Sequence, residues 1–177
     1  MQERLGSLAG RTVAFVGDGA CNMGNSWLVA GATAGMHVRV SAPDSHEPHR
    51  DMAARAAAVA ETTGGSVRLV ADPREAVSGA DVVVTDTWVS MGKETEADAR
   101  LAAFAGYSVT SELMALAPEA IVMHCLPAYR GKEIDAAVLD GPRSVVWDEA
   151  ENRRHAQKAI LTWLARQAGL EAAREGT

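Results

Sequence analysis

The sequence predicts an α/β fold built on a doubly wound parallel sheet. Short apolar runs alternate along the 177 residues with alanine-rich stretches of helical character, the pattern that βαβ units produce. A glycine-rich segment, 17–26, follows the first apolar run, and the apolar run 120–123 stops abruptly ahead of Pro127. Both features place loops at the carboxyl ends of buried strands, where open α/β sheets bind ligands.

Each predicted element has its own signal. Apolar, often β-branched runs predict six strands, at 12–16, 38–40, 67–70, 81–85, 120–123 and 145–147. Alanine-rich or amphipathic stretches predict helices at 27–34, 51–61, 73–77, 97–104 and 112–117, and a last helix that ends near 167. Asp148, with Glu151 three residues on, forms the expected N-terminal cap of that last helix. Because no repeat or low-complexity linker divides the chain, we expect one three-layer, Rossmann-like domain over 1–177, frayed from 171.

The composition excludes several classes of protein. Hydrophobic residues make up 47% of the chain and charged residues 23%, and the net charge is -6, which argues against a nucleic-acid or acidic-membrane partner. The sequence contains neither a run that could span a bilayer nor a signal-peptide pattern. Cys21 and Cys125 lie in different predicted loops, and no cysteine or histidine cluster has zinc-ligand spacing. We therefore expect a cytoplasmic protein with reduced thiols, no metal and no cofactor.

The glycine-rich segment resembles a dinucleotide fingerprint only loosely, and such a pattern alone is a weak signal. A nicotinamide-binding domain usually carries an acidic residue at the end of its second strand, whereas this strand ends in Ser41-Ala42-Pro43. A tight strand-to-helix turn explains the glycines but not Asn22. The amide of Asn22 could meet a carboxylate or phosphate at the helix N-terminus.

A second polar loop, 86–92, begins where the fourth strand ends. Asp86 can pair with an ammonium group, and Ser90 and the backbone of Met91 can bond a carboxylate. Those are the two needs of an amino-acid ligand. A solvated loop in which Asp86 caps a turn explains the same residues equally well.

Two potentially reactive side chains, His124 and Cys125, follow the fifth strand. A thiol beside an aspartate and an amine can accept or relay a proton. Packing offers an alternative, because buried free cysteines and satisfied core histidines are common.

Arg153 is the candidate site residue on the last helix. It lies one turn before Ala156, on the face that carries an apolar stripe of Ala156, Ile160, Trp163 and Leu164. We therefore expect Arg153, but not Arg154, to face the sheet or its crevice, where a guanidinium suits a phosphate or a polarised carbonyl. The alternative is a surface ion pair with Asp148 or Glu149.

The loops after strands one, four and five and the helix after strand six thus converge on one edge of the sheet. The motifs there, DTWVSMG, HCLPAYRG and WDEAENRRHAQKA, with an upstream GDG and asparagine, resemble the C-terminal, ornithine-binding half of the ornithine carbamoyltransferases. The resemblance runs from about residue 8 to residue 164. It implies transfer of a carbamoyl group from carbamoyl phosphate to the side-chain amine of L-ornithine, which gives L-citrulline and phosphate.

The resemblance also implies roles for individual residues. The α-carboxylate and α-amino group of ornithine would be held by Asn22, Asp86, Ser90 and Met91. Cys125 would lie beside the attacking amine as proton acceptor or positioning group, and the main chain of Cys125 and Leu126 would meet the carbamoyl group. Arg153 would stabilise charge on the carbamoyl phosphate oxygens, and His124 would support the site. The chain departs from many relatives in carrying Cys21 where they have asparagine and Asn25 where they have histidine.

Family members are about twice as long, and their other half supplies most of the groups that bind carbamoyl phosphate. We expect this chain to lack that half, and alone to bind ornithine weakly with little or no turnover. Two alternatives stay open from the sequence: a non-catalytic amino-acid-binding remnant or subunit, and a nicotinamide-binding dehydrogenase domain.

Overall fold

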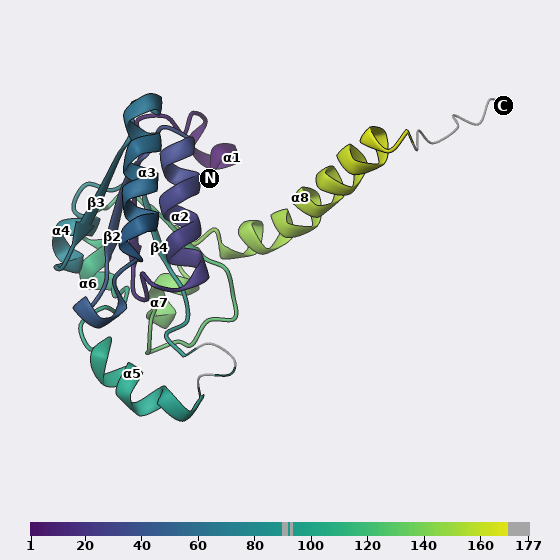
Figure 1. Cartoon of the computed structure of the whole chain (residues 1–177). Helices are drawn as coiled ribbons and strands as arrows, with labels where there is room; N and C mark the ends of the chain where they lie inside the picture. Colours follow the sequence, from purple (N-terminus) through teal and green to yellow (C-terminus); the bar gives the residue numbers. More distant parts are fainter. Residues whose placement is uncertain (90–91, 93, 170–177) are drawn as a thin grey trace.

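The structure, a computed structural model, describes residues 1–89, 92 and 94–169. Its centre is a parallel sheet of five strands in the order β3-β2-β1-β4-β5 (Figure 1). The strands are β1 (Thr12–Val16), β2 (His37–Ser41), β3 (Ser66–Val70), β4 (Val82–Thr85) and β5 (Ile121–His124). The order reverses direction at β1, which is the arrangement expected of a doubly wound sheet.

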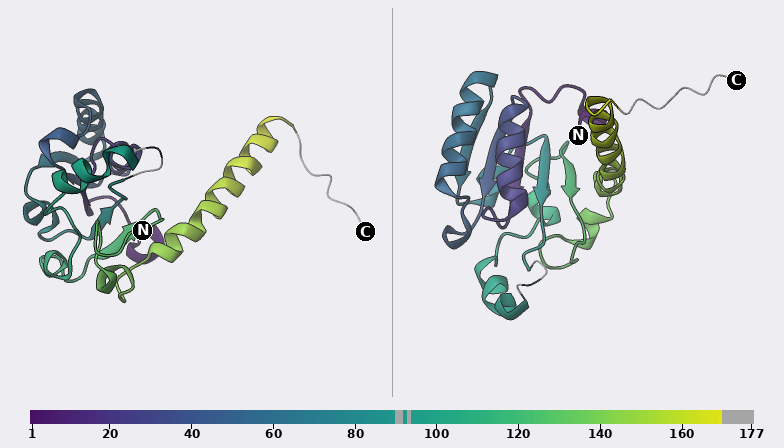
Figure 2. Two further views of the ribbon diagram at one scale, coloured as in Figure 1. Left: turned by 90° about the horizontal axis from the view of Figure 1, so that it is seen from below. Right: turned by 45° about the vertical axis from the view of Figure 1, so that its right-hand side comes forward.

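Helices cover both faces of the sheet. They are α1 (Gln2–Leu5), α2 (Asn22–Thr33), α3 (Arg50–Thr63), α4 (Pro73–Val77), α5 (Ala97–Ala103), α6 (Ser111–Met114), α7 (Ala136–Leu139) and α8 (Val146–Gln167), with short 3-10 turns η1 (Asp44–His46) and η2 (Glu94–Glu96). Figure 2 shows α2 and α3 side by side on one face. Along β1, Val13 and Phe15 pack into the core on the α2 side, whereas Ala14 and Val16 pack into the core beneath α4, α6 and α7. The predicted three-layer architecture is confirmed.

The prediction of a sixth strand at 145–147 is wrong. The segment reaches the sheet through an isolated bridge between Ser144 and Val122 and forms no strand. In that bridge the Val122 N–H donates to the Arg143 carbonyl and the Val145 N–H donates to the Val122 carbonyl. The chain then enters α8 at Val146, so Asp148 lies in the first turn of the helix and does not cap it. Val145 and Val146 are buried, as a strand would require, but they stand at the start of a helix. An apolar run this short does not distinguish a strand from a buried helix end.

The helix after the glycine-rich turn begins at Asn22, earlier than the expected start at 27. Cys21 is its N-cap, and the Cys21 sulfur accepts the Gly24 N–H at 3.3 Å. A Cβ atom placed on Gly24 would lie 2.5 Å from the Gly19 carbonyl oxygen. The glycine at 24 is therefore what lets the start of α2 pack against the turn that precedes it.

Helix α8 leaves the sheet and projects away from the rest of the chain (Figures 1 and 2). Val146 is its only buried residue in the described range. The apolar stripe expected to pack on the sheet is instead open, with Ile160 57%, Trp163 59% and Leu164 49% exposed. None of the helices among residues 1–89, 92 and 94–169 combines the length and apolar composition needed to cross a bilayer.

Candidate active site

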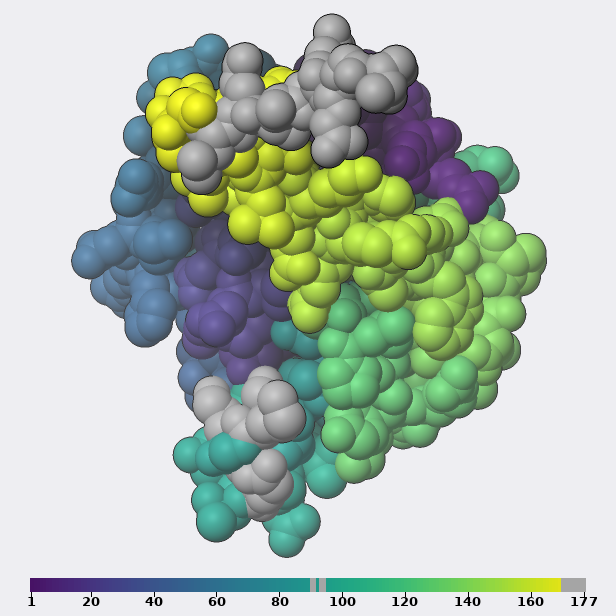
Figure 3. Space-filling view, turned by 90° about the vertical axis from the view of Figure 1, so that its right-hand side faces the viewer, coloured from purple at the N-terminus to yellow at the C-terminus, as the bar shows by residue number. Residues whose placement is uncertain are grey.

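Strand register brings three loops to one point at the carboxyl edge of the sheet. Val16 pairs with Thr85, and Thr85 pairs with His124. The residues that follow these three strand ends therefore lie side by side. Asp86 is next to Cys125 on one side, and on the other it is next to the turn that leads to Cys21. In Figure 3 the segments after β1, β4 and β5, in purple, teal and green, meet below α8.

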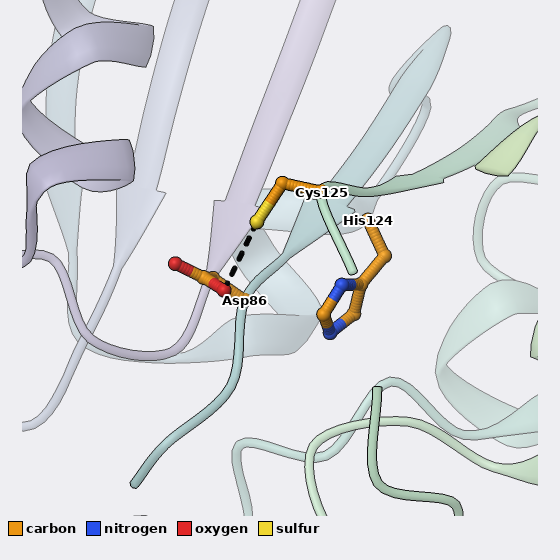
Figure 4. A group of neighbouring side chains, drawn as sticks. All are labelled: Asp86, His124 and Cys125. Carbon is orange, nitrogen blue, oxygen red and sulfur yellow. Dashed lines mark hydrogen bonds between the residues drawn. The ribbon is translucent and has the colours of Figure 1, made fainter. Parts of the chain in front are cut away.

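Asp86 is the centre of this group. Its Oδ1 accepts the Cys125 thiol at 3.2 Å (Figure 4). The same oxygen accepts the Thr87 N–H at 2.7 Å, and Oδ2 lies 3.8 Å from the Cys21 sulfur. The side chain is only 9% exposed. No ion pair reaches this carboxylate from the described part of the chain. A nearly buried carboxylate without a cation is suited to bind an ammonium group.

Both thiols at the site are held in the protonated form. Burial, followed by the charge of Asp86 and the hydrogen bond to it, raises the pKa of Cys125 to about 12. Burial is also the largest cause that raises the pKa of Cys21 to about 11. The Cys125 thiol is therefore a donor to Asp86 at neutral pH, and it is a poor proton acceptor.

This arrangement predicts slow alkylation of Cys125. At about pH 8 its thiolate fraction is on the order of a thousandfold below that of an ordinary cysteine. Asp86→Asn removes the charge that opposes the thiolate but leaves the burial, so we expect faster alkylation by iodoacetamide, followed by mass spectrometry. The matched background is Cys21→Ser, which keeps a capping oxygen at the start of α2. Equal rates with and without the Asp86 charge would contradict the account.

His124 is fully buried and turns to the other side of the strand end from Cys125 (Figure 4). Potential metal ligands of Asp86, His124 and Cys125 lie within 4.8 Å of one another. Both ring nitrogens of His124 are already in use, however: Nδ1 accepts the Leu126 N–H at 2.9 Å, and Nε2 lies 3.3 Å from Glu133. These three residues therefore offer a metal ion one carboxylate and one thiol, which is fewer ligands than a protein zinc site uses.

Glu149 is a site residue that sequence reasoning missed. It lies in the first turn of α8, where its charge acts on Cys125 and the charge of Asp86 acts on it. Burial raises the pKa of Glu149, and the opposing hydrogen bond from the His124 main chain only partly offsets this. The sequence signal was present in the acidic start of the helix, but that signal also describes an ordinary surface helix.

The raised pKa of Glu149 predicts a pH-dependent effect of Glu149→Gln. Between the usual glutamate pKa of about 4.3 and the raised value, the folded state binds the proton more tightly than the unfolded state. The contribution of Glu149 to stability therefore falls as pH rises through this window. Relative to wild type, we expect Glu149→Gln to gain stability between about pH 4 and pH 7. Urea midpoints at both pH values measure this, and a constant difference between the two proteins would contradict it.

Three of the other predicted site residues are Asn22, Ser90 and Met91, and Asn25 lies close to the first of them in the sequence. Asn22 is the first residue of α2 and is exposed, so its side chain is at the rim of the site. Asn25, which departs from many relatives, ties the glycine-rich turn through bonds from its amide to the Ala20 and Cys21 carbonyls. Ser90 and Met91 lie outside the described residues.

The expected orientation of Arg153 is wrong for this structure. Arg153 and Arg154 are both exposed, because the part of α8 that carries them has left the sheet. The alternative surface pairs of Arg153 with Asp148 or Glu149 are also not formed among the described residues, and Asp148 pairs instead with Arg4. The apolar stripe correctly marks one face of α8, but that face has no partner within the described chain.

The doubly wound sheet places the chain among the α/β domains that bind ligands at a topological switch point, and Asp86 follows β4 at that point, between β1 and β4. The chain matches the family described as aspartate/ornithine carbamoyltransferase, Asp/Orn binding domain, over residues 9–164. The chain therefore belongs to the aspartate/ornithine carbamoyltransferase family, and the resemblance seen in its motifs is confirmed.

Individual relatives agree. An ornithine carbamoyltransferase of Clavibacter michiganensis subsp. michiganensis is 61% identical over 168 residues, which cover 94% of this chain and 55% of that protein. The structure resembles ornithine carbamoyltransferase from Pyrococcus furiosus, with a TM-score of 0.86 at 45% identity over 90% of this chain and 51% of the other. An N-acetyl-L-ornithine transcarbamylase complexed with PALAO is 31% identical, with a TM-score of 0.78, and is covered to 52%. This chain spans about half the length of these relatives.

Proposed function

We propose that this chain is the ornithine-binding half of an ornithine carbamoyltransferase, with domain limits 1–177. The observation that carries the proposal is the nearly buried Asp86 carboxylate, which has two thiols and no cation beside it in the described chain. Ornithine supplies the missing positive charge with its ammonium groups. Asn22, Ser90 and Met91 complete the binding of its α-carboxylate and α-amino group.

In the proposed reaction the side-chain amine of ornithine attacks the carbonyl carbon of carbamoyl phosphate. The new C–N bond forms as the C–O bond to phosphate breaks, and the amine loses a proton. Of the two roles considered for Cys125, positioning is the better supported, because a thiol that donates to Asp86 and has a pKa near 12 is a weak base. Asp86 is the group placed to receive the proton.

The turn after β5 is suited to the carbamoyl group. The Leu126 N–H is used by His124, and among the described residues no donor is bonded to the carbonyl oxygens of Cys125 and Leu126. Carbonyl oxygens accept N–H groups. The turn therefore recognises the amide end of the carbamoyl group, whereas the oxygens of carbamoyl phosphate require cations such as Arg153 and the carbamoyl-phosphate half.

The exposed apolar face of α8 is the surface proposed for that other half. Its residues Ile160, Trp163 and Leu164 are each about half exposed, and an apolar patch of this kind marks an interaction site. Binding of the other half to this face would also fix the position of Arg153, because α8 carries Arg153 as well as the apolar residues. The relatives, which are about twice as long, supply a candidate partner of the required size.

We expect Ile160→Glu to prevent association with a carbamoyl-phosphate half while leaving ornithine binding by the pure chain unchanged. The charge would have to be buried without a partner. Thr162→Glu is the matched control, because residue 162 lies on the opposite side of the helix. Association is measured by size-exclusion chromatography with light scattering. Equal loss with both variants would contradict an interface on the apolar face.

The proposed activity is tested by citrulline formation from carbamoyl phosphate and ornithine. The chain is assayed alone and then with a separately expressed carbamoyl-phosphate half from a related enzyme, and N-acetyl-L-ornithine replaces ornithine in a parallel assay. Activity only in the mixture, and only with ornithine, is expected. Robust turnover by the chain alone would contradict the dependence on another half. Ornithine binding without turnover, in a mixture shown to associate, would support a binding remnant instead.

A further inference from the structure

The fully buried pair of His124 and Glu133 is not explained by substrate contacts. Both residues are 0% exposed. His124 ends β5, and Glu133 lies in the segment that follows the turn, where its carbonyl accepts the Val109 N–H at 2.8 Å. Burying a carboxylate costs free energy unless the carboxylate is hydrogen-bonded. The hydrogen bonds of this pair therefore indicate what it does.

The hydrogen bonds assign the protons of the pair. The Leu126 N–H donates to Nδ1 of His124 at 2.9 Å, so Nδ1 carries no proton. The ring proton is therefore on Nε2, which lies 3.3 Å from Oε1 of Glu133. That oxygen also accepts the Tyr129 N–H at 2.5 Å. Glu133 thus binds the ring of His124 and also the main chain of Tyr129, at the end of the turn 125–129.

The turn itself needs such support. Leu126 has a φ of 58°, in the left-handed region that residues with a side chain seldom adopt. Its N–H donates to the ring Nδ1 of His124, and no second acceptor for it is found among the described residues. If the His124 proton moved to Nδ1, that nitrogen could no longer accept, and the Leu126 N–H would lose its partner inside the protein.

We propose that Glu133 is a positioning residue, which holds His124 in the Nε2–H tautomer so that Nδ1 can anchor the Leu126 main chain that faces the substrate. This inference rests on the proposed function, because the substrate is what gives the turn its purpose. It assigns His124 an indirect role, and it adds a residue that no motif had marked. A carboxylate that orients a histidine in this way is a common supporting arrangement at protein sites.

The test combines a spectroscopic measurement with ligand binding. In the wild-type chain carrying isotope-labelled histidine, nitrogen NMR is expected to show His124 as the Nε2–H tautomer. Glu133→Gln keeps an accepting oxygen and is expected to keep both the tautomer and the ornithine Kd. Glu133→Met has a similar shape without an acceptor, so we expect a shift toward the Nδ1–H tautomer, a displaced Leu126 amide signal and a Kd raised by about tenfold.

Glu112→Gln is the control for loss of an exposed negative charge, and it should change none of these quantities. An Nδ1–H tautomer in the wild type would overturn the proposal, even if Glu133→Met failed to fold. An unchanged tautomer and Kd in folded Glu133→Met would also overturn it. If the wild-type chain binds no ornithine, the proposed function fails, whereas the tautomer measurement still tests the relay from Glu133 to Leu126.

Discussion

Arg100→Ala is expected to destabilise the folded chain by about 3–5 kcal/mol, the cost of leaving a buried charge without its partner. Arg100 is 5% exposed and pairs with Asp18, which is 2% exposed. Its Nε donates to the Trp88 carbonyl at 2.5 Å, and a further nitrogen lies 3.1 Å from His46. Arg100 therefore joins α5 to the glycine-rich turn and to the loop that contains Asp86.

Urea unfolding measures this effect, with the midpoint expected to fall while the slope stays the same. The matched control is Arg68→Ala, because Arg68 forms an exposed pair with Glu75 that should contribute little. A double-mutant cycle with Asp18→Asn isolates the coupling, since the double variant no longer leaves a buried carboxylate unpaired. Equal effects of Arg100→Ala and Arg68→Ala would show that the buried pair is not important for stability.

Asp86→Asn is expected to weaken ornithine binding by about 10- to 150-fold, which corresponds to about 1.5–3 kcal/mol for a hydrogen bond to a charged group. The asparagine keeps an oxygen that can accept the Thr87 N–H and the Cys125 thiol, so the local structure should survive. What it removes is the negative charge that attracts an ammonium group. The expected loss is therefore in affinity rather than in folding.

Asp98→Asn controls for the change in net charge, because Asp98 is exposed on α5. Binding is followed by chemical-shift changes on titration with ornithine, and folding by the urea midpoint. Norvaline, which lacks the side-chain amine of ornithine, tests which ammonium group Asp86 meets. If Asp86→Asn and Asp98→Asn bound ornithine equally well, Asp86 would not be the ammonium site.

The centre of the sheet could be predicted from the sequence because β1, β4 and β5 are almost wholly buried and appear as apolar runs. The strands β2 and β3 each contain an arginine and were recognised from their valines and from the turns around them. The parallel arrangement made part of the site predictable. Parallel strands end at one edge, so Asp86 and Cys125 could be expected together before their register was known. The HCLP and SMG motifs then indicated the family that the comparisons confirm.

What sequence reasoning missed are tertiary contacts. Cys21 was noted as a departure from many relatives, but its contact with Asp86 was not predicted. Glu149 lies in the first turn of a helix that begins where a strand was expected. Glu133 lies nine residues from His124, at a spacing that matches no regular element. Arg153 shows the opposite error: its helical face was correctly identified, but periodicity cannot tell whether the covering partner belongs to the same chain.

The most direct test of the central claim is calorimetric titration of the pure chain with L-ornithine at about pH 8. We expect saturable one-to-one binding that is weak in the isolated chain, is weakened about 10- to 150-fold further by Asp86→Asn and is unchanged by Asp98→Asn. Absence of binding by a folded wild-type chain, or binding that Asp86→Asn leaves intact, would contradict the assignment of this chain as an ornithine-binding half.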